Sequence, residues 1–523
     1  MSKQISRKQF LTILGTGAAG AALAACAPAA LPAPPAEKPA AATAVPVPEA
    51  TAVQPTEAPP PTQAPVAKQP LEIQFDAGGY CPSKYIGRDL EEGEPARQAF
   101  DDVVNAYMEL HPDVKITFLP IPMGDRREVM ITQLTGGTAP DILWTQPDWV
   151  NEDLGKGWWM NLDPYLDMPS PYSPADNPGA KRWHDSFYPS VDFWRAPDGH
   201  LYMLLGDQTQ VGLYYNKDMF DKAGVTEEPM TWVDMIAAAE KVKQAGFPGF
   251  AWCGGGRGVL DQLTWTTGWL AKYFFWKYMS TYDTNKNGWA DKWEMGDAIK
   301  AGTYSANMEE QVARLRTLKD MAVYWQDGAL GMDWEATHRL FLTGGAGMEI
   351  TGVWMLANFL KDPERKFDLG WFYFPAVTKD TSSMIPDGVP MTNLACGYGS
   401  FQFALTNTAL TKNSADTCAD FLMFSTTPEN IGKIVNEVPS TIANVVGAAL
   451  HPLTVQMGFA DSIQYPPSVF QEDDSLLDFE YGMNFASVVS PYCVGQLDEA
   501  AMLEQLQGYM NSAADRVLAT RPA

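Results

Sequence analysis

Short apolar runs alternate with amphipathic stretches in the part of the chain that follows residue 70. The alternating pattern of residues 71–75 predicts a strand, and residues 96–110 carry apolar side chains at the spacing of one helix face. The order continues with a strand at 114–119, a helix at 126–134 and a buried strand at 141–144. Strands separated by helices in this way are typical of a parallel sheet with crossover helices.

The next well-patterned segment, residues 199–246, contains a strand, a polar loop, a second strand and two helices. The apolar run 201–205 and the β-prone run 211–215 predict the two strands. The longer helix is expected to begin after Thr231, because Thr231 and Asp234 have the spacing of a capping box.

Three stretches resemble a known family. The run GLYYNKDMFDKAGV at 212–225, followed by Thr231-Trp232, resembles the signature of the extracellular solute-binding proteins of ABC importers, in the carbohydrate-binding family (family 1 type). FLTGGAGMEITGVW at 341–354 and LGWFYFP at 369–375 resemble further landmarks, and they occur in the order found in the family. The resemblance extends from about residue 71 to the end of the chain. It implies an α/β protein with the two-lobed periplasmic-binding-protein type II fold, in which each lobe is a mostly parallel sheet flanked by helices and crossover segments act as hinges.

The length of the chain agrees with two lobes, because 523 residues are too many for one compact core. The resemblance implies that residues 71–205 and 375–430 form lobe 1. Residues 206–374 and 431–523 are then expected to form lobe 2. In the family, the segment that corresponds to residues 206–210 is part of the first crossover and lies on the wall of the ligand cleft.

Candidate ligand contacts lie at the ends of predicted strands and in the first crossover. Ligands of open α/β sheets bind beyond the carboxyl ends of the strands. Sugars stack on aromatic rings, while amides and carboxylates pair with their hydroxyls. Together with the resemblance, these rules nominate Asp76, Gly78, Trp144, Gln146, Gln208, Gln210, Trp252, Trp354 and Tyr398. The alternative for each tryptophan is packing in the core, which we also expect for the Trp158-Trp159 pair, and for the first-crossover glutamines it is a surface loop.

Residues 283–294 match the calcium-loop pattern D-x-[DN]-x-[DN]-G-x5-E in full. Calcium is a hard cation that takes six to eight oxygen ligands, and this spacing supplies them. The expected ligands are the side chains of Asp283, Asn285, Asn287, Asp291 and Glu294, and the backbone carbonyl of Trp289. We therefore expect a structural Ca²⁺ ion in an insertion of lobe 2, and no organic cofactor. The alternative is a solvated polar loop.

The N-terminus has the parts of a bacterial export signal within residues 1–26. The sequence Leu-Ala-Ala-Cys that ends at Cys26 resembles a lipobox, which would make Cys26 the lipid-modified first residue of the mature chain. Residues 6–11 resemble a twin-arginine motif with Lys8 in place of the second arginine, so both Sec and Tat export stay open. Residues 27–70 are rich in Ala, Pro and Thr and predict an extended tether. We expect an extracytoplasmic protein that is lipid-anchored to the bacterial cell membrane.

The five remaining cysteines do not define a metal site or a disulfide pattern. In an oxidising compartment they allow zero, one or two disulfides and leave at least one thiol. No CxxC motif or Cys/His cluster is present, so we do not expect a zinc site. These residues are Cys81, Cys253, Cys396, Cys418 and Cys493.

Charge and motif content narrow the class of function. The formal net charge of −26 disfavours nucleic acids and anionic membranes as partners. The chain has no GxSxG, HExxH or P-loop motif, and no pair of acidic residues stands out as a glycosidase pair, so we predict that it is not an enzyme. The leading hypothesis is a monomeric receptor that captures a sugar or oligosaccharide and delivers it to an ABC permease, with the lipid anchor as its only membrane contact. The alternatives are a receptor for a non-sugar solute and a surface structural lipoprotein without a transport role.

Overall fold

The computed structural model describes residues 70–521, except for 91–95, 123–125, 193–194, 197, 256–257, 287–289, 393–398, 460–464 and 466–476. The export signal with Cys26, the tether, and Asn287, Trp289, Cys396 and Tyr398 therefore lie outside the described residues. None of the helices in the described part of the chain is both long and apolar enough to cross a membrane.

Five strands form the sheet of the first lobe, in the order β2-β1-β3-β10-β4. β1 is parallel to β2 and to β3, as the alternation of strands and helices predicts. β10 returns from much later in the chain and is antiparallel to both β3 and β4. The bounds are β1 (Leu71–Asp76), β2 (Val114–Phe118), β3 (Ile142–Trp144), β4 (Leu204–Leu205) and β10 (Gln402–Leu405).

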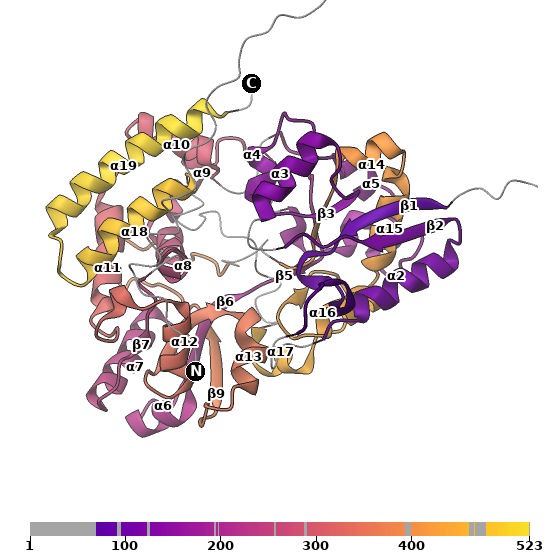
Figure 1. Ribbon diagram of the computed structural model, residues 1–523. Coiled ribbons are helices and arrows are strands. Elements are labelled where there is room, and N and C mark those ends of the chain that lie inside the picture. The colour runs from indigo at the N-terminus through magenta and orange to yellow at the C-terminus, as the bar shows by residue number, and fades with distance from the viewer. Residues whose placement is uncertain are drawn as a thin grey trace, which may run out of the picture. The chain divides into compact units, whose positions relative to one another are not determined.

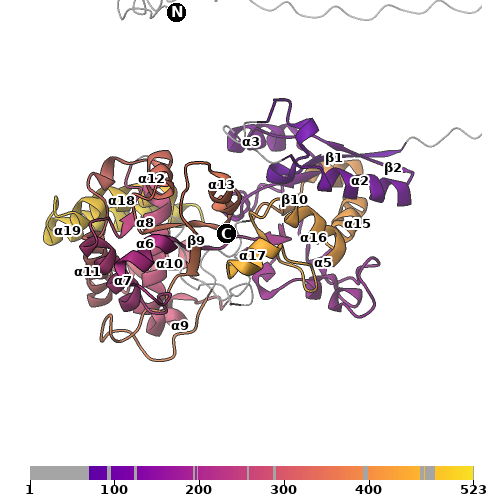
Figure 2. The same ribbon diagram turned by 90° about the horizontal axis from the view of Figure 1, so that it is seen from below.

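Helices that cover this sheet come from two separate parts of the chain, residues 99–166 and 407–436. They include the predicted segments near 96–110 and 126–134, and Figures 1 and 2 show them gathered around β1 and β2. Phe75 lies at the centre of the core, with its ring 5.1 Å from that of Phe100 and 5.0 Å from that of Phe403. The helices are α2 (Ala99–Leu110), α3 (Arg126–Gly136), α4 (Pro147–Glu152), α5 (Asp163–Leu166), α14 (Asn407–Lys412), α15 (Ala415–Ser425) and α16 (Pro428–Asn436).

Four strands form the sheet of the second lobe, in the order β7-β8-β6-β9. β7 is parallel to β8, but β6 is antiparallel to both of its neighbours, so this sheet is mixed. The bounds are β6 (Val211–Asn216), β7 (Phe250–Ala251), β8 (Met348–Gly352) and β9 (Leu369–Tyr373). All six residues of β6 are buried, which places this strand in the middle of the lobe.

The second lobe contains most of the helices, and its core includes residues from the C-terminal end of the chain. α18 and α19 pack on α8, α10 and α11, and Tyr481, Phe485 and Met510 are fully buried there. The predicted capping box of Thr231 and Asp234 is present at the start of α7. The helices are α6 (Lys217–Ala223), α7 (Trp232–Gln244), α8 (Gly258–Phe274), α9 (Met279–Tyr282), α10 (Lys292–Lys300), α11 (Glu309–Ala322), α12 (Trp334–Leu342), α13 (Leu356–Lys361), α17 (Pro452–Gln456), α18 (Phe479–Cys493) and α19 (Glu499–Ala519).

The core of each lobe extends beyond the boundaries expected from the resemblance. Ile431 and Val435 follow residue 430, yet they pack in the core of the first lobe, because α16 is one continuous helix that lies against α2. Val377 and Ile385 follow residue 374, yet they pack in the core of the second lobe. The observed lobe boundaries therefore follow the ends of helices and strands. They do not coincide with the positions of the family motifs in the sequence.

The passage between the lobes near residue 206 is a short two-stranded ladder. β5 (Asp207–Gln208) begins one residue after the end of β4, with Gly206 between them, and pairs with β11 (Ile442–Ala443). β6 begins three residues after β5 and enters the second sheet. The first crossover thus pairs with β11, and the ladder hydrogen bonds restrict the backbone of the crossover.

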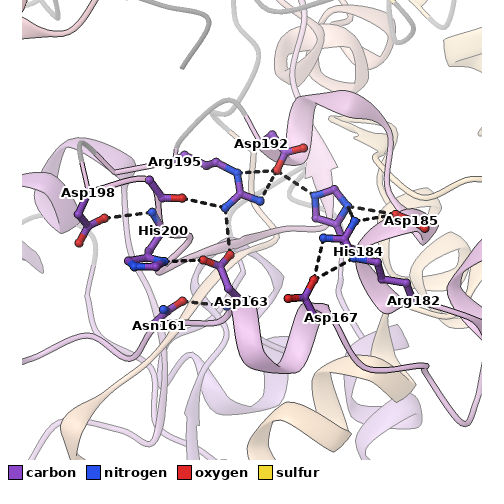
Figure 3. A network of polar contacts seen from close by, with 11 residues as sticks. Asn161, Asp163, Asp167, Arg182, His184, Asp185, Asp192, Arg195, Asp198 and His200 are labelled. Atoms are coloured by element: carbon purple, nitrogen blue, oxygen red, sulfur yellow. Dashed lines mark hydrogen bonds and ion pairs between the residues drawn. The ribbon is translucent and has the colours of Figure 1, made fainter. Parts of the chain in front are cut away.

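A network of charged side chains braces residues 161–200 of the first lobe, as Figure 3 shows. Arg195 donates to Asp163 at 3.0 Å and to Asp192 at 2.9 Å. His184 and Asp192 are 2.9 Å apart, with Asp192 shared between the imidazole and the guanidinium. Exposed ion pairs contribute little singly, but here one carboxylate connects two partners and fixes a segment that has no long helix.

The His184–Asp192 contact is expected to make stability depend on pH. The hydrogen bond to Asp192 raises the pKa of His184, so the folded state binds this proton more tightly than the unfolded state does. The stabilisation is present below about pH 6.5 and is lost as the pH rises through the folded pKa. The difference in melting temperature between the wild type and His184→Gln should therefore shrink between about pH 6 and pH 8. In an Asp192→Asn background this change with pH should be much smaller, because only the weaker contact with Asp185 still raises the pKa of His184. An unchanged pH dependence would show that another group is responsible.

The four cysteines within the described residues are free thiols. Cys81, Cys253, Cys418 and Cys493 are all buried and form no disulfide with one another. Burial raises the pKa of the Cys81 and Cys253 thiols to about 12. A thiol that stays protonated is a poor nucleophile, so these side chains act as small apolar residues of the core.

Candidate functional site

Three of the nominated residues meet at the carboxyl ends of β1 and β3. Asp76 is the last residue of β1 and is fully buried, and Trp144 is the last residue of β3 and is 5% exposed. Gly78 lies against the Trp144 ring, and a Cβ atom at this position would come within 2.4 Å of that ring. Its φ of +52° also favours glycine. We call Asp76, Gly78 and Trp144 the strand-end cluster.

Asp76 is held by a buried arginine. The Arg126 guanidinium donates a hydrogen bond to Asp76 and lies 4.7 Å from the centre of the Trp144 ring. The Ile121 amide also donates to the Asp76 carboxylate, at 3.2 Å. Burial raises the pKa of Asp76 to about 6, while Arg126 and the backbone donors oppose this shift. The carboxylate is therefore ionised at neutral pH and positions Arg126 over the Trp144 ring.

Hydrogen bonds connect the strand-end cluster to the first crossover. Tyr80, two residues after Gly78, donates to Asp207 at 2.6 Å. Asp207 also accepts from the Phe401 amide at 2.7 Å, and it is fully buried. The next residue, Gln208, is fully buried and donates to Asn444 at 3.3 Å. The first crossover is thus fixed to the end of β1 through one carboxylate.

Gln210 connects the crossover to the end of β8. Its backbone carbonyl accepts from the amide of Val353, the residue before Trp354, at 2.9 Å. Trp354 is half-buried and its ring packs against Trp265 at 5.6 Å. The predicted residues Gln210 and Trp354, which are 144 positions apart in the sequence, are therefore brought together.

Several buried polar atoms in this region have no hydrogen-bond partner within the described residues. The side-chain amide of Gln210 has neither a donor nor an acceptor, although the residue is fully buried. The Trp144 Nε1 and the hydroxyls of Thr145 and Thr351 are likewise unpaired. Such atoms are costly to bury. Their presence at strand ends and at the crossover marks where a polar ligand or water would complete the hydrogen bonding.

The remaining candidate ligand contacts, Gln146, Trp252 and Tyr398, differ in their burial and surroundings. Gln146 is half-buried at the start of α4, next to Trp144 and Thr145. Trp252 is fully buried in the second core, and its ring is stacked on Trp325 at 4.0 Å, with 10° between the ring planes. This position matches the packing alternative, so we do not retain Trp252 in the candidate site. Tyr398 lies outside the described residues.

Lys272 is a buried basic residue that belongs to none of the sequence motifs. It is 1% exposed, and its Nζ lies 4.3 Å and 4.5 Å from the ring centres of Trp269 and Tyr273. Burial lowers the pKa of Lys272 to about 7, and no acceptor for its Nζ is found in the described part of the chain. Trp265 lies seven residues earlier on the same helix face. A lysine placed near Trp269 and Tyr273 on one helix was the signal that sequence reasoning could have used.

Within the described part of the calcium-loop motif, polar side chains form hydrogen bonds with other residues of the same motif. Glu294 accepts from the Thr284 and Asn285 amides at 2.7 and 2.8 Å, and Asn285 donates to Asp291 at 3.3 Å. Asp291 and Glu294 also form the capping box of α10, which by itself accounts for two residues of the motif. Burial raises the pKa of Asp291 to about 6. Within the described residues, no three His, Cys, Asp or Glu side chains are close enough together to hold a metal ion.

Comparison with protein families decides the affiliation of the chain. The model of the bacterial extracellular solute-binding proteins matches residues 91–430. The chain belongs to this family. The family resemblance expected from the sequence motifs is therefore confirmed. This solute-binding protein belongs to an extracellular family whose members are binding proteins, not enzymes.

Curated relatives of this solute-binding protein are distant. A binding protein of Brucella abortus is 24% identical over 278 residues, which are 53% of this chain and 59% of the relative. The sn-glycerol-3-phosphate-binding periplasmic protein UgpB of Escherichia coli K12 is 26% identical over 296 residues, covering 55% of this chain and 60% of UgpB. The solute-binding protein thus spans about 60% of the length of the curated relatives it matches.

Solved structures confirm the fold of this solute-binding protein. The bacterial solute receptor AcbH, described as preferring β-D-galactopyranose, aligns with a TM-score of 0.59 over 86% of this chain and all of AcbH, at 16% identity. A secreted solute-binding lipoprotein from Streptomyces coelicolor aligns with a TM-score of 0.58 over 85% of this chain and 98% of its own, at 16% identity. The two-lobed α/β prediction is confirmed by these neighbours.

Proposed function

We propose that this solute-binding protein is the extracytoplasmic receptor of an ABC importer and captures a sugar or oligosaccharide between its two lobes. The observation that carries the proposal is the juxtaposition of the strand-end cluster, the first crossover and Trp354. These elements come from both lobes and from the passage between them. The aromatic ring of Trp354 and the unpaired amide of Gln210 are the kinds of groups that sugars contact.

The arrangement suits a mechanism of capture by closure. A ligand held by both lobes stabilises the closed state, because only that state offers all of the contacts at once. Hinge rotation requires that the crossover segments absorb the change in backbone angles. The β5–β11 ladder and the Tyr80–Asp207 hydrogen bond then keep the crossover in register with the first lobe. The closed form would dock on the permease and release the solute.

A thermal-shift screen of the full chain tests the proposal. The panel should include monosaccharides, malto- and chito-oligosaccharides, raffinose, polyols, amino acids and polyamines. A ligand at a hundredfold excess over its dissociation constant is expected to add about 2.7 kcal/mol to the free energy of unfolding. Stabilisation by a saccharide supports the proposal. A response to amino acids or polyamines alone would reject the sugar assignment, and no response to any member would favour a structural lipoprotein.

A polyol phosphate is the second candidate solute. Lys272 favours it, because its buried Nζ has no acceptor within the described residues and could pair with a phosphate, and UgpB by its name binds sn-glycerol 3-phosphate. The same screen should therefore include glycerol 3-phosphate. Stabilisation by this anion in the wild type, with loss of the effect in Lys272→Met, would support the second candidate over a neutral sugar.

We also propose that Cys26 carries the lipid that retains the receptor at the cell membrane. The lipobox-like sequence before it and the Ala/Pro/Thr-rich stretch after it support this assignment. Several acyl chains on one residue would hold the protein firmly, whereas one chain would hold it only weakly. Residues 27–70 would then act as a spacer between the membrane and the lobes.

A structural calcium ion at residues 283–294 is a further proposal that follows from the full motif match. Carboxylate and amide oxygens of Asp283, Asn285, Asp291 and Glu294 would supply ligands, and Asn287 and Trp289 complete the set expected from the sequence. The helix–loop–helix context is present, with α9 ending at Tyr282 and α10 beginning at Lys292. The ion would hold the entering and leaving helices together.

Replacing Glu294 by glutamine separates the metal role from the capping role. Glutamine can complete a capping box as glutamate does, but it cannot bind calcium in bidentate fashion. We expect EGTA to lower the melting temperature of the wild type in differential scanning calorimetry and to have no effect on Glu294→Gln. Glu335→Gln, an exposed residue in the first turn of α12, is the control and should behave as the wild type. An unchanged wild-type midpoint in EGTA would contradict the proposal.

A further inference from the structure

Three segments connect the cores of the two lobes in the described part of the chain. The first crossover is residues 206–210, between β4 and β6. A second crossover lies between Ile385, in the core of the second lobe, and Phe401, in the core of the first. A third follows α16 and leads to Phe459, whose ring lies 4.3 Å from that of Trp371 in β9. A rotation of one lobe against the other must therefore be absorbed within these segments.

The Asp207 carboxylate connects the first crossover to the other two. The Ser400 and Phe401 amides, at the end of the second crossover, donate to it at 3.2 and 2.7 Å. The Tyr80 hydroxyl donates to it at 2.6 Å, and the Tyr80 and Thr441 hydroxyl oxygens are 2.6 Å apart. Thr441 belongs to the third crossover, so Asp207 connects all three crossovers with the segment that follows β1. We call these five residues the Asp207 clamp.

The Asp207 clamp is buried and closely packed. Asp207 and Phe401 are both fully buried. A Cβ atom at Gly399 would overlap the Asp207 carboxylate, and one at Gly206 would come within 2.4 Å of the Phe401 ring. Burial raises the pKa of Asp207, and the hydrogen bonds from Tyr80 and the backbone amides oppose this shift. A buried carboxyl group needs its hydrogen-bond donors, so the crossovers cannot separate at this point without a cost in free energy.

The two ends of the first crossover are bonded to different lobes. The Gln208 side chain donates to Asn444 at 3.3 Å, and the Asn444 side chain donates to the carbonyl of the last residue of β4 at 3.1 Å. These contacts hold Gln208 on the first lobe. The backbone carbonyl of Gln210 accepts from the amide of Val353, directly after β8, which holds Gln210 on the second lobe. Thr209 is the residue between these two attachments.

We infer that the first crossover bends at Thr209 when the lobes move, and that Asp207 is the positioning residue that confines the bend to this place. Hinges are a few residues whose φ and ψ angles absorb the rotation of two rigid parts. Here the residues up to Gln208 belong to the hydrogen-bonded unit of the first lobe, whereas Gln210 follows the second lobe. The Asp207 clamp holds the other two crossovers as well, so their bends are expected between the clamp and the second lobe. The inference rests on the proposed receptor function and assigns the residues that locate its hinge.

Distances between spin labels on the two lobes, measured by double electron–electron resonance, test the inference on the full chain without solute. The labels are attached through Glu109→Cys in α2 and Lys222→Cys in α6, and both positions are exposed. The four native cysteines within the described residues are buried, and Cys26 and Cys396 are replaced by serine. The labelled chain without further substitutions is the reference.

Three variants address the clamp and the bend. Asp207→Asn places an amide NH₂ group among the donors of the Asp207 clamp, so its distance distribution should be about twice as wide as the reference. Thr209→Gly gives the backbone more freedom at the bend and should have a similar effect. Tyr80→Phe removes one donor and should give an intermediate width, and it serves as the test of the clamp if Asp207→Asn does not fold.

Two control variants separate the hinge from general effects on folding. Asp141→Asn alters another fully buried carboxylate of the first lobe, which lies directly before β3 and outside the crossovers. It should lower the melting temperature and keep the reference distribution. Thr226→Gly frees the backbone at an exposed position between α6 and α7 and should also keep the reference distribution.

The outcomes separate the inference from the function on which it rests. If Tyr80→Phe and Thr209→Gly fold and both give the reference distribution, the hinge lies elsewhere and the inference is overturned. Equal broadening by Asp141→Asn would attribute the effect to lost stability and would overturn the role of Asp207. If no solute of the thermal-shift panel shortens the distance in the reference chain, the proposed receptor function fails. The solute-free distributions of the variants decide the position of the hinge in either case.

Discussion

Replacing Arg126 by methionine is expected to lower the free energy of unfolding by about 3–5 kcal/mol. Arg126 is 2% exposed and Asp76 is fully buried, so the substitution would leave a carboxylate in the core without its cation. The Ile121 carbonyl would also lose the donor that reaches it at 2.5 Å. Chemical denaturation at pH 7 measures the change directly.

Two further variants identify the uncompensated charge as the cause. Arg126→Met combined with Asp76→Asn should recover most of the lost stability, because the remaining group is neutral. Arg182→Met removes ion pairs with Asp167 and Asp185 whose partners are all well exposed, and it should cost less than about 1 kcal/mol. A loss of similar size in Arg182→Met and Arg126→Met would contradict the explanation by burial.

Replacing Trp354 by alanine is expected to lower the affinity for the solute about 10- to 100-fold. The half-buried ring stands at the end of β8 beside the crossover, so its removal takes away a face on which a sugar ring would stack. Titration with the best saccharide of the screen measures the effect. The midpoint of thermal unfolding should change little, since part of the ring is already exposed.

Trp252→Ala is the matched comparison for Trp354→Ala. Trp252 is fully buried against Trp325, so truncation should leave a cavity and lower the free energy of unfolding by about 3–5 kcal/mol. At a temperature where the variant remains folded, the affinity for the solute should stay within a few-fold of the wild type. A large loss of affinity in Trp252→Ala with unchanged affinity in Trp354→Ala would reverse the roles assigned to the two residues.

Local patterns predicted the elements of the lobes well. The strands expected at 71–75 and 211–215 are β1 and β6, each one residue longer, and the helix expected after Thr231 is α7. These elements are set by side-chain periodicity and by capping residues near their ends, which a sequence displays directly. The mixed order of the second sheet could not be read in this way, because the direction of pairing depends on how distant strands meet.

The candidate site was only partly accessible to sequence reasoning. Asp76, Trp144 and Trp354 were nominated because they lie at the ends of predicted strands, and the structure places Asp76 and Trp144 at strand ends and Trp354 two residues after β8. Trp252 also follows a strand, but the ring of Trp325, 73 residues later, covers it. A sequence pattern indicates which side chains follow a strand. It does not show whether a distant segment of the chain packs against these side chains and buries them.

The sequence by itself determined the family, the alternation of strands and helices, and the residue types that could contact a sugar or a calcium ion, since motifs and periodicity are local properties. Only the tertiary structure decided that Gln210 meets the end of β8, that Arg126 compensates Asp76, and that the Phe401 amide meets Asp207. Each of these contacts joins residues separated by many positions. They form because burial of the two hydrophobic cores brings those segments together. The free energy gained by this burial depends on the whole fold.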